Sequence, residues 1–153
     1  MHPVTLLVSS IALMIYFLAV WRGGAPERVA GGVLLVVFVA DEIHASLAGR
    51  VSFQQFEPFL FVTDLLQLLV FTWLSLRANR MWPLVPAALK LVAVIGHLAA
   101  LLLHSGGKLA YWAMVEPPAV LSIVVLACGL TAHWRRQRRI GPYPDWRPEP
   151  ALR

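Results

Sequence analysis

Five runs of about twenty mostly apolar residues constrain this chain most strongly, because each run is long enough to cross a bilayer. Apolar residues make up 59% of the chain and charged residues 14%, whereas about a quarter of an ordinary soluble domain is charged. The runs predict an all-α fold, a bundle of five transmembrane helices in one domain (1–140). We place the spans at about residues 4–20, 29–48, 58–76, 83–104 and 111–133, followed by a proline-rich, extended and poorly ordered cytoplasmic tail (141–153).

Basic residues follow the first, third and fifth runs, which a five-span threading puts on one side of the membrane. These residues are Arg22, Arg28, Arg77, Arg80 and the cluster Arg135, Arg136, Arg138 and Arg139. The opposite side carries only Arg50 and Lys108. The excess of positive charge on cytoplasmic loops predicts an N-terminus outside and a C-terminus in the cytoplasm. The formal charge of +5 is thus explained by topology and by anchoring to anionic lipid, and we predict no nucleic-acid partner.

The fourth run, residues 83–104, carries ionisable side chains at a regular spacing. Lys90, His97 and His104 are each seven residues apart, which is close to two helical turns, so they project from nearly one face. An ionisable stripe in an apolar helix is costly in lipid, and therefore faces protein, water or a partner. This stripe predicts a polar interior on that side of the fourth span.

Polar residues of three spans fall at a common depth. At a rise of about 1.5 Å per residue, Asp41, Asp64 and His97 each lie about 10 Å from the predicted outer end of their helices. Lys90 is placed about 10 Å deeper, towards the cytoplasm. Further polar residues are predicted near or above the common level: Glu42, His44, Gln67, His104 and Glu116.

Three interpretations of this polar layer remain open. In the first interpretation, carboxylates and imidazoles pair across helices and fix the packing of the bundle. In the second, Asp41, His44, Asp64, His97 and Lys90 form a proton or ion path, with the chain as an oligomer. In the third, a haem or metal ion is held by histidines, with His44, His97 and His104 as candidate ligands. The scattered spacing of these histidines contains no dense ligand motif.

The chain has little material for a soluble-substrate site, and no set of nucleophile, base and orienting group can be assembled from its sequence. We therefore do not favour an enzyme. The small size and near absence of extramembrane sequence favour an accessory subunit that packs against a larger membrane complex or against further copies of itself. A proton- or ion-conducting protein is the main rival, and a haem- or metal-binding protein is the third possibility.

Several strings resemble a loose group of short, uncharacterised integral membrane proteins of alphaproteobacteria, particularly sphingomonads. The resemblance is carried by residues 21–28 (WRGGAPER), 76–83 (LRANRMWP) and 129–136 (GLTAHWRR), together with Asp64 and His97. It implies a multi-pass protein of the inner (plasma) membrane of a Gram-negative bacterium, and it implies no activity. Residues 41–44 (DEIH) depart from the pattern of that group.

Overall fold

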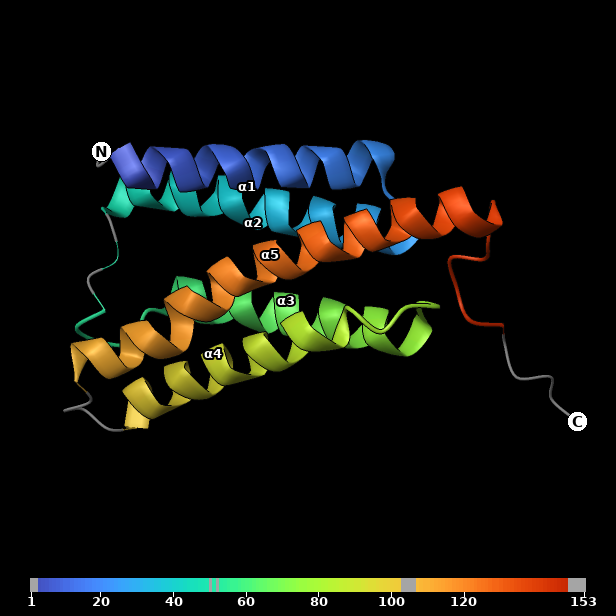
Figure 1. The fold of residues 1–153 in the computed structure, drawn as a ribbon. Coiled ribbons are helices and arrows are strands. Elements are labelled where there is room, and N and C mark those ends of the chain that lie inside the picture. Colours follow the sequence, from blue (N-terminus) through green and yellow to red (C-terminus); the bar gives the residue numbers. More distant parts are fainter. Residues whose placement is uncertain (1–2, 50, 52, 103–106, 149–153) are drawn as a thin grey trace, which may run out of the picture.

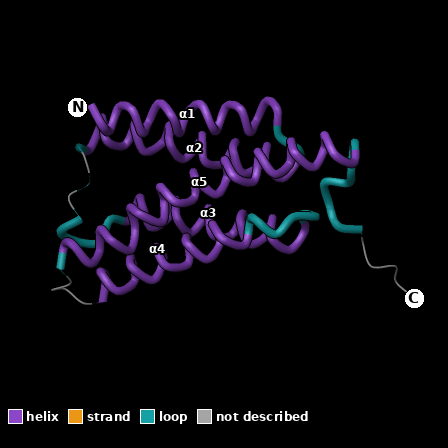
Figure 2. The backbone as a smooth tube through the Cα atoms, viewed as in Figure 1, coloured by secondary structure: helices purple, strands orange, loops and turns teal. Residues whose placement is uncertain are grey.

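The apolar runs form antiparallel α-helices, joined by short loops (Figures 1 and 2). This is a computed structural model, and it describes residues 3–49, 51, 53–102 and 107–148. The helices are α1 (Pro3–Arg22), α2 (Ala25–Ala48), α3 (Pro58–Arg77), α4 (Leu84–Leu102) and α5 (Lys108–Ile140). Each of the five is long and apolar enough to cross a membrane, which confirms the predicted set of spans as helices.

Two helix ends differ from the prediction. The helix α2 begins at Ala25, about one turn early, because Pro26 suits a first turn, where no backbone amide is needed. The helix α5 continues about two turns past His133, so the arginine cluster is helical. It ends at Gly141, whose φ of 77° lies in the left-handed region that glycine adopts without a steric cost. Residues 134–140, which the prediction left outside the fifth span, are therefore part of α5.

Two adjacent prolines lie inside the fifth helix. The helix α5 begins at Lys108, and Pro117 and Pro118 are both interior to it. Neither proline can donate an amide to the preceding turn, so the backbone of α5 is weakened at this point. The neighbouring Glu116 belongs to the polar region described below.

The bundle consists of two groups of closely packed helices. The helices α1 and α2 pack along each other, α4 packs on both α3 and α5, and contacts between these two groups are sparser. Small residues allow the close approaches: a Cβ atom added at Gly96 of α4 would lie 2.7 Å from the Cβ of Met114 in α5. Looser contact between the groups leaves space for the cavities that the polar residues line.

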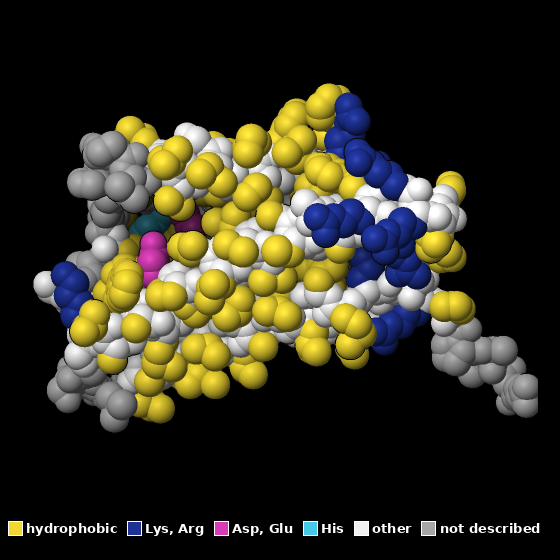
Figure 3. Space-filling view, viewed as in Figure 1, with side chains coloured by type: hydrophobic (Ala, Val, Ile, Leu, Met, Phe, Trp, Pro, Cys, Tyr) yellow, Lys and Arg dark blue, Asp and Glu magenta, His cyan; other side chains and the backbone are white. Residues whose placement is uncertain are grey.

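The apolar core occupies the middle of the bundle and its arginine-rich end. It combines Tyr16 of α1, Leu34 of α2, Phe71 and Leu74 of α3, and Leu126 of α5, with alanines where helices come close. The outer flanks carry many exposed leucine, isoleucine and valine side chains, as helices facing lipid do. Figure 3 shows this apolar flank and the lysine and arginine side chains gathered mainly at one end of the bundle.

The segment after α5 returns to the bundle instead of leaving it. We predicted an extended, poorly ordered tail, and residues 141–148 are extended but held by backbone hydrogen bonds. The amide of Asn79 donates to the carbonyl of Asp145 at 3.0 Å, and the amide of Arg147 donates to the carbonyl of Arg77 at 2.9 Å. The ring of Trp146 lies 5.5 Å from that of Trp73. The prediction for residues 149–153 concerns positions outside the described residues.

Candidate functional site

A buried ionic cluster joins α3, α4 and α5 near the end of the bundle opposite the arginines. One carboxylate oxygen of Asp64 lies 2.7 Å from the Lys90 ammonium, and the other lies 3.1 Å from Nε2 of His97. The second ring nitrogen of His97 is 2.7 Å from the hydroxyl of Tyr111. Gln67 donates a longer hydrogen bond of 3.4 Å to Asp64. We call these five residues the Asp64 cluster.

Helical spacing brings the members of the Asp64 cluster together. Lys90 and His97 lie two turns apart on the face of α4 that is turned towards α3. The prediction placed Lys90 about 10 Å deeper than His97, but its long side chain extends along the helix so that the ammonium reaches the same carboxylate. Lys90 therefore belongs to the cluster and does not extend it towards the other end. His104, the third member of the predicted stripe, lies outside the described residues.

Tyr111 is the member that sequence reasoning missed. Its side chain is buried and its hydroxyl contacts His97. The hydroxyl also accepts a hydrogen bond of 3.3 Å from the backbone amide of Glu57. Both ring nitrogens of His97 thus have protein partners, so in this conformation the imidazole has no free nitrogen for a haem or a metal ion.

A cavity of about 200 Å³ separates the Asp64 cluster from α2 and is bordered by two further carboxylates, Asp41 and Glu116. Asp64 and Lys90 also line it, so three carboxylates and one ammonium face the same space. Among the described residues, the Oδ1 atom of Asp41 is buried and has no hydrogen-bond partner. Glu116 is exposed on the flank of α5. The cavity is therefore richer in acidic groups than Lys90 alone neutralises.

A neighbouring cavity of about 260 Å³ continues this acidic region between α2 and the start of α3. It shares Asp41 and Glu116 with the first cavity, and adds Glu42 and His44. The imidazole of His44 stacks on the ring of Phe59, with centroids 4.2 Å apart, so it packs against α3 and is not part of the Asp64 cluster. Figure 3 shows acidic and histidine side chains in a hollow of the apolar flank here. Among the described residues, no group of three or more histidine, cysteine, aspartate or glutamate side chains could hold a metal ion.

A second buried ionic group lies at the arginine-rich end and was not predicted. Arg80, in the loop between α3 and α4, lies 2.8 Å from Glu27 and 2.6 Å from Asp145. It also donates to Tyr143 at 3.0 Å and lies 2.9 Å from Nδ1 of His133. We call these five residues the Arg80 node. Glu27 receives a further hydrogen bond from the indole of Trp82 at 2.9 Å.

Asp145 connects the returning C-terminal segment to the start of α2. Its second carboxylate oxygen accepts a hydrogen bond of 2.9 Å from the amide of Ala25. This amide is at the N-terminus of α2, where backbone donors have no partner within the helix. Burial alone would raise the pKa of Asp145, but this amide and the Arg80 guanidinium outweigh burial and hold the pKa below its ordinary value. The charge pattern had assigned Arg80 to topology alone. No spacing signal relates the members of the node, because they are far apart along the chain.

The predicted lipid anchors lie on the outside of this end. Arg135, Arg138 and Arg139 are exposed on the last turns of α5, and the guanidinium of Arg136 lies 4.2 Å from the ring centroid of Tyr143. Their anchoring to lipid headgroups stays a prediction.

An apolar layer separates the two ionic groups. Along α2, Glu27 of the Arg80 node and Asp41 of the acidic cavity are about 20 Å apart. The intervening interior is filled by the core residues Leu34, Phe71 and Leu126. Within the described part of the chain, the ionic groups therefore form two separate sites and not one path.

Comparison with known proteins adds no relative: none of the family models matches the chain, and neither a curated protein nor a solved structure does.

Proposed function

We propose that the chain is a small accessory subunit of a larger membrane complex, to which it contributes a site that binds protons. The observation that carries this proposal is the acidic cavity, where Asp41 and Glu116 add two carboxylates beyond the Asp64–Lys90 pair. Two uncompensated carboxylates at membrane depth are costly. Binding of protons removes this cost, so proton binding is the chemistry that the cavity favours.

The separation of the two ionic groups supports binding at one end of the membrane and not conduction through the chain. A path across the bilayer needs polar groups or water along its length, whereas Leu34, Phe71 and Leu126 lie between the acidic cavity and the Arg80 node. The chain alone therefore provides a one-ended site. A partner that covers the exposed flank of Glu116 would complete its enclosure.

The distribution of charge supports an orientation for this site. Arginines gather at the end that carries the Arg80 node, which the positive-inside rule assigns to the cytoplasm. The N-terminus and the acidic cavity would then lie towards the outside. The resemblance to alphaproteobacterial membrane proteins favours the inner membrane as the location.

The subunit part of the proposal is tested by crosslinking from the flank of Glu116 in intact cells. A photoreactive amino acid at Val120, exposed one turn from Glu116, should give a discrete product with a membrane protein; the matched control is Val62, exposed on α3. Mild-detergent extraction should recover the same product in a larger complex. Recovery of a monomer alone, with no product specific to position 120, would overturn the subunit assignment.

The binding part is tested by proton uptake after a rapid pH decrease, followed with an indicator dye on purified protein in nanodiscs. The double variant Asp41→Asn, Glu116→Gln should lose uptake, while Glu42→Gln, which alters a neighbouring exposed carboxylate, should retain it. Reconstituted vesicles should show no sustained proton flux through the chain alone. Equal uptake in the double variant and the native chain would refute this site.

A further inference from the structure

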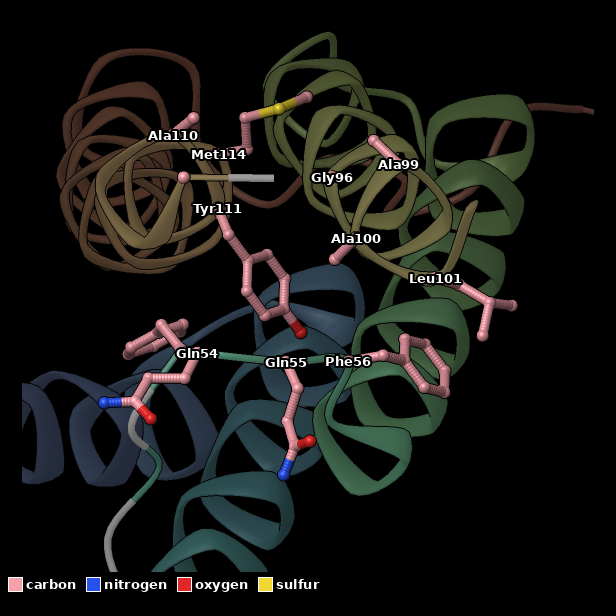
Figure 4. Close-up of a pocket in the computed structure, with 12 residues that line it drawn as sticks. Gln54, Gln55, Phe56, Gly96, Ala99, Ala100, Leu101, Ala110, Tyr111 and Met114 are labelled. Carbon is pink, nitrogen blue, oxygen red and sulfur yellow. The ribbon is translucent and has the colours of Figure 1, made fainter. Parts of the chain in front are cut away.

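A separate pocket of about 470 Å³ lies between the outer ends of α4 and α5 and the linker before α3 (Figure 4). Its volume falls within the range of small-molecule sites. All of the described residues that line it are uncharged, in contrast to the acidic cavity on the other side of the Asp64 cluster. The pocket therefore suits a neutral ligand and not an ion.

The walls of the pocket are apolar and partly aromatic. Phe53 and Phe56 from the linker, Ala100 of α4 and Met114 of α5 contribute to it. The ring of Phe53 meets that of Tyr111 edge-on, with centroids 5.6 Å apart. Phe53 has a φ of 55°, in a left-handed region that a non-glycine residue seldom adopts, and such strain is retained at sites of function more often than elsewhere.

Polar groups in the lining are few. The ring of Tyr111 extends from α5 towards the linker, whereas the side chains of Gln54 and Gln55 point away from Ala100 and Met114 (Figure 4). A phenol both donates and accepts hydrogen bonds. A single phenol on mostly apolar walls matches the usual composition of a small-molecule pocket, in which a few polar groups fix the orientation of the ligand.

Tyr111 connects the pocket to the Asp64 cluster. Its oxygen accepts a hydrogen bond from the Glu57 amide and also contacts Nδ1 of His97. The single hydroxyl proton can therefore be donated either to His97 or to a ligand. When Nδ1 of His97 carries no proton, the hydroxyl donates to it. When Nδ1 is protonated, the imidazole donates to the hydroxyl, which is then free to donate to a ligand. A hydrogen bond from Tyr111 to a ligand oxygen therefore depends on which ring nitrogen of His97 carries the hydrogen.

We propose that this pocket binds a neutral, lipid-soluble ring compound that carries hydrogen-bonding oxygens, of the quinone or quinol class. The uncharged lining excludes ionic headgroups, the aromatic side chains favour a flat ring, and the Tyr111 hydroxyl matches an oxygen on that ring. An acyl chain would use the apolar walls but not the hydroxyl. The proposal goes beyond proton binding and does not depend on Asp41 or Glu116.

The test is calorimetric titration of the full chain in nanodiscs with a benzoquinone that carries a ten-carbon tail. Decanol, which has a tail of the same length and no ring, is the control ligand. The quinone should bind saturably and at least tenfold more tightly than decanol. Ala100→Phe should weaken quinone binding at least tenfold by filling the pocket, while Ala113→Phe, exposed outside the pocket on α5, should change it less than twofold.

A third variant tests the polar contact. Tyr111→Phe keeps the aromatic wall and removes the hydroxyl, so quinone affinity should fall about fivefold while decanol affinity stays the same. A thermal unfolding curve identifies any variant that fails to fold. Among folded variants, Tyr111→Phe reports on the hydrogen bond between the Tyr111 hydroxyl and the quinone, and Ala113→Phe reports on ligand that partitions into the lipid. Equal binding of quinone and decanol, or full quinone affinity in folded Ala100→Phe, would overturn the proposal.

Discussion

The Asp64 cluster with its cavity and the Arg80 node are built from the same residue types but differ in how completely the charges are paired. In the Arg80 node, one guanidinium contacts two carboxylates, a phenol and an imidazole, and Asp145 also binds a helix N-terminus. At the other end, the only ion pair of Lys90 among the described residues is with Asp64, while Asp41 and Glu116 face a cavity. Within the described part of the chain, each carboxylate of the first group is paired with the guanidinium, so that group is saturated, whereas Asp41 and Glu116 have no such pair.

This difference separates architecture from function in a bundle with buried charges at both ends. A saturated group holds helix ends and the C-terminal segment together and has no capacity left for a ligand. An unsaturated group has an electrostatic cost in the bundle, and binding a proton, a cation or a partner reduces that cost. Substitutions should therefore reduce mainly stability at the Arg80 node and mainly binding at the acidic cavity.

The largest effect on stability is expected from Arg80→Met. It leaves Glu27 buried without its cation, so the free energy of unfolding in detergent micelles should fall by about 3–5 kcal/mol. Arg139→Met, on the exposed end of α5, is the control and should change stability by less than about 0.5 kcal/mol. Adding Glu27→Met to Arg80→Met should restore part of the loss. A fall below about 1 kcal/mol for Arg80→Met would contradict a structural role for the node.

Lys90→Met should cost less than Arg80→Met. Asp64 loses its ammonium partner but retains His97 and Gln67, so we expect a loss of about 2 kcal/mol in the same unfolding measurement. The matched control is Leu91→Met, on the exposed face of α4, which should leave the free energy of unfolding nearly unchanged. If Lys90→Met were the more damaging of the two cation removals, the contrast between the groups would be reversed.

Asp145→Asn should cost about 1 kcal/mol, because the substitution weakens a capping interaction and an ion pair that remains partly exposed. The pKa of Asp145 is depressed in the folded chain, so its contribution is fully present above the unfolded value of about 3.9 and is lost as the pH falls through the folded value. The difference between native and variant stabilities should thus be constant above about pH 5 and decrease below about pH 4. If the stability difference between the native chain and Asp145→Asn grew as the pH fell, the pKa of Asp145 would be raised by folding and this prediction would be wrong.

Asp41→Asn should have the smallest effect on stability and a large effect on proton uptake. Removing an unpaired charge from the cavity should leave the free energy of unfolding unchanged within about 0.5 kcal/mol, or raise it. Uptake after acidification, measured with the indicator dye, should decrease. A marked destabilisation together with normal uptake would place Asp41 among the structural residues, and the contrast drawn above would then be wrong.

Local spacing predicted much of the fold but only part of the polar arrangement. Apolar run length identified the five helices, and the seven-residue repeat on α4 placed Lys90 and His97 on one face. Depth counting uses only Cα positions, so it separated Lys90 from Asp64 and overlooked the reach of a lysine side chain. It also could not reveal that Tyr111 turns inward at the end of its helix.

The Arg80 node was missed for a different reason. Its members come from the start of α2, a loop, the end of α5 and the C-terminal segment, and no periodicity relates positions that distant. Proline content indicated an extended tail, which residues 141–148 are, but composition does not report which backbone groups an extended segment will meet. Only the three-dimensional arrangement relates Asp145 to the amide of Ala25.

The contact between Asp145 and Ala25 has a consequence for the order of assembly during synthesis. The first two helices can enter the bilayer as a hairpin long before residue 145 leaves the ribosome, and until then the first amide of α2 lacks this carboxylate cap. The segment 141–148 thus completes a contact that begins at the second helix. A nascent chain stopped before residue 145 would hold its spans in the membrane without the hydrogen bond between Ala25 and Asp145.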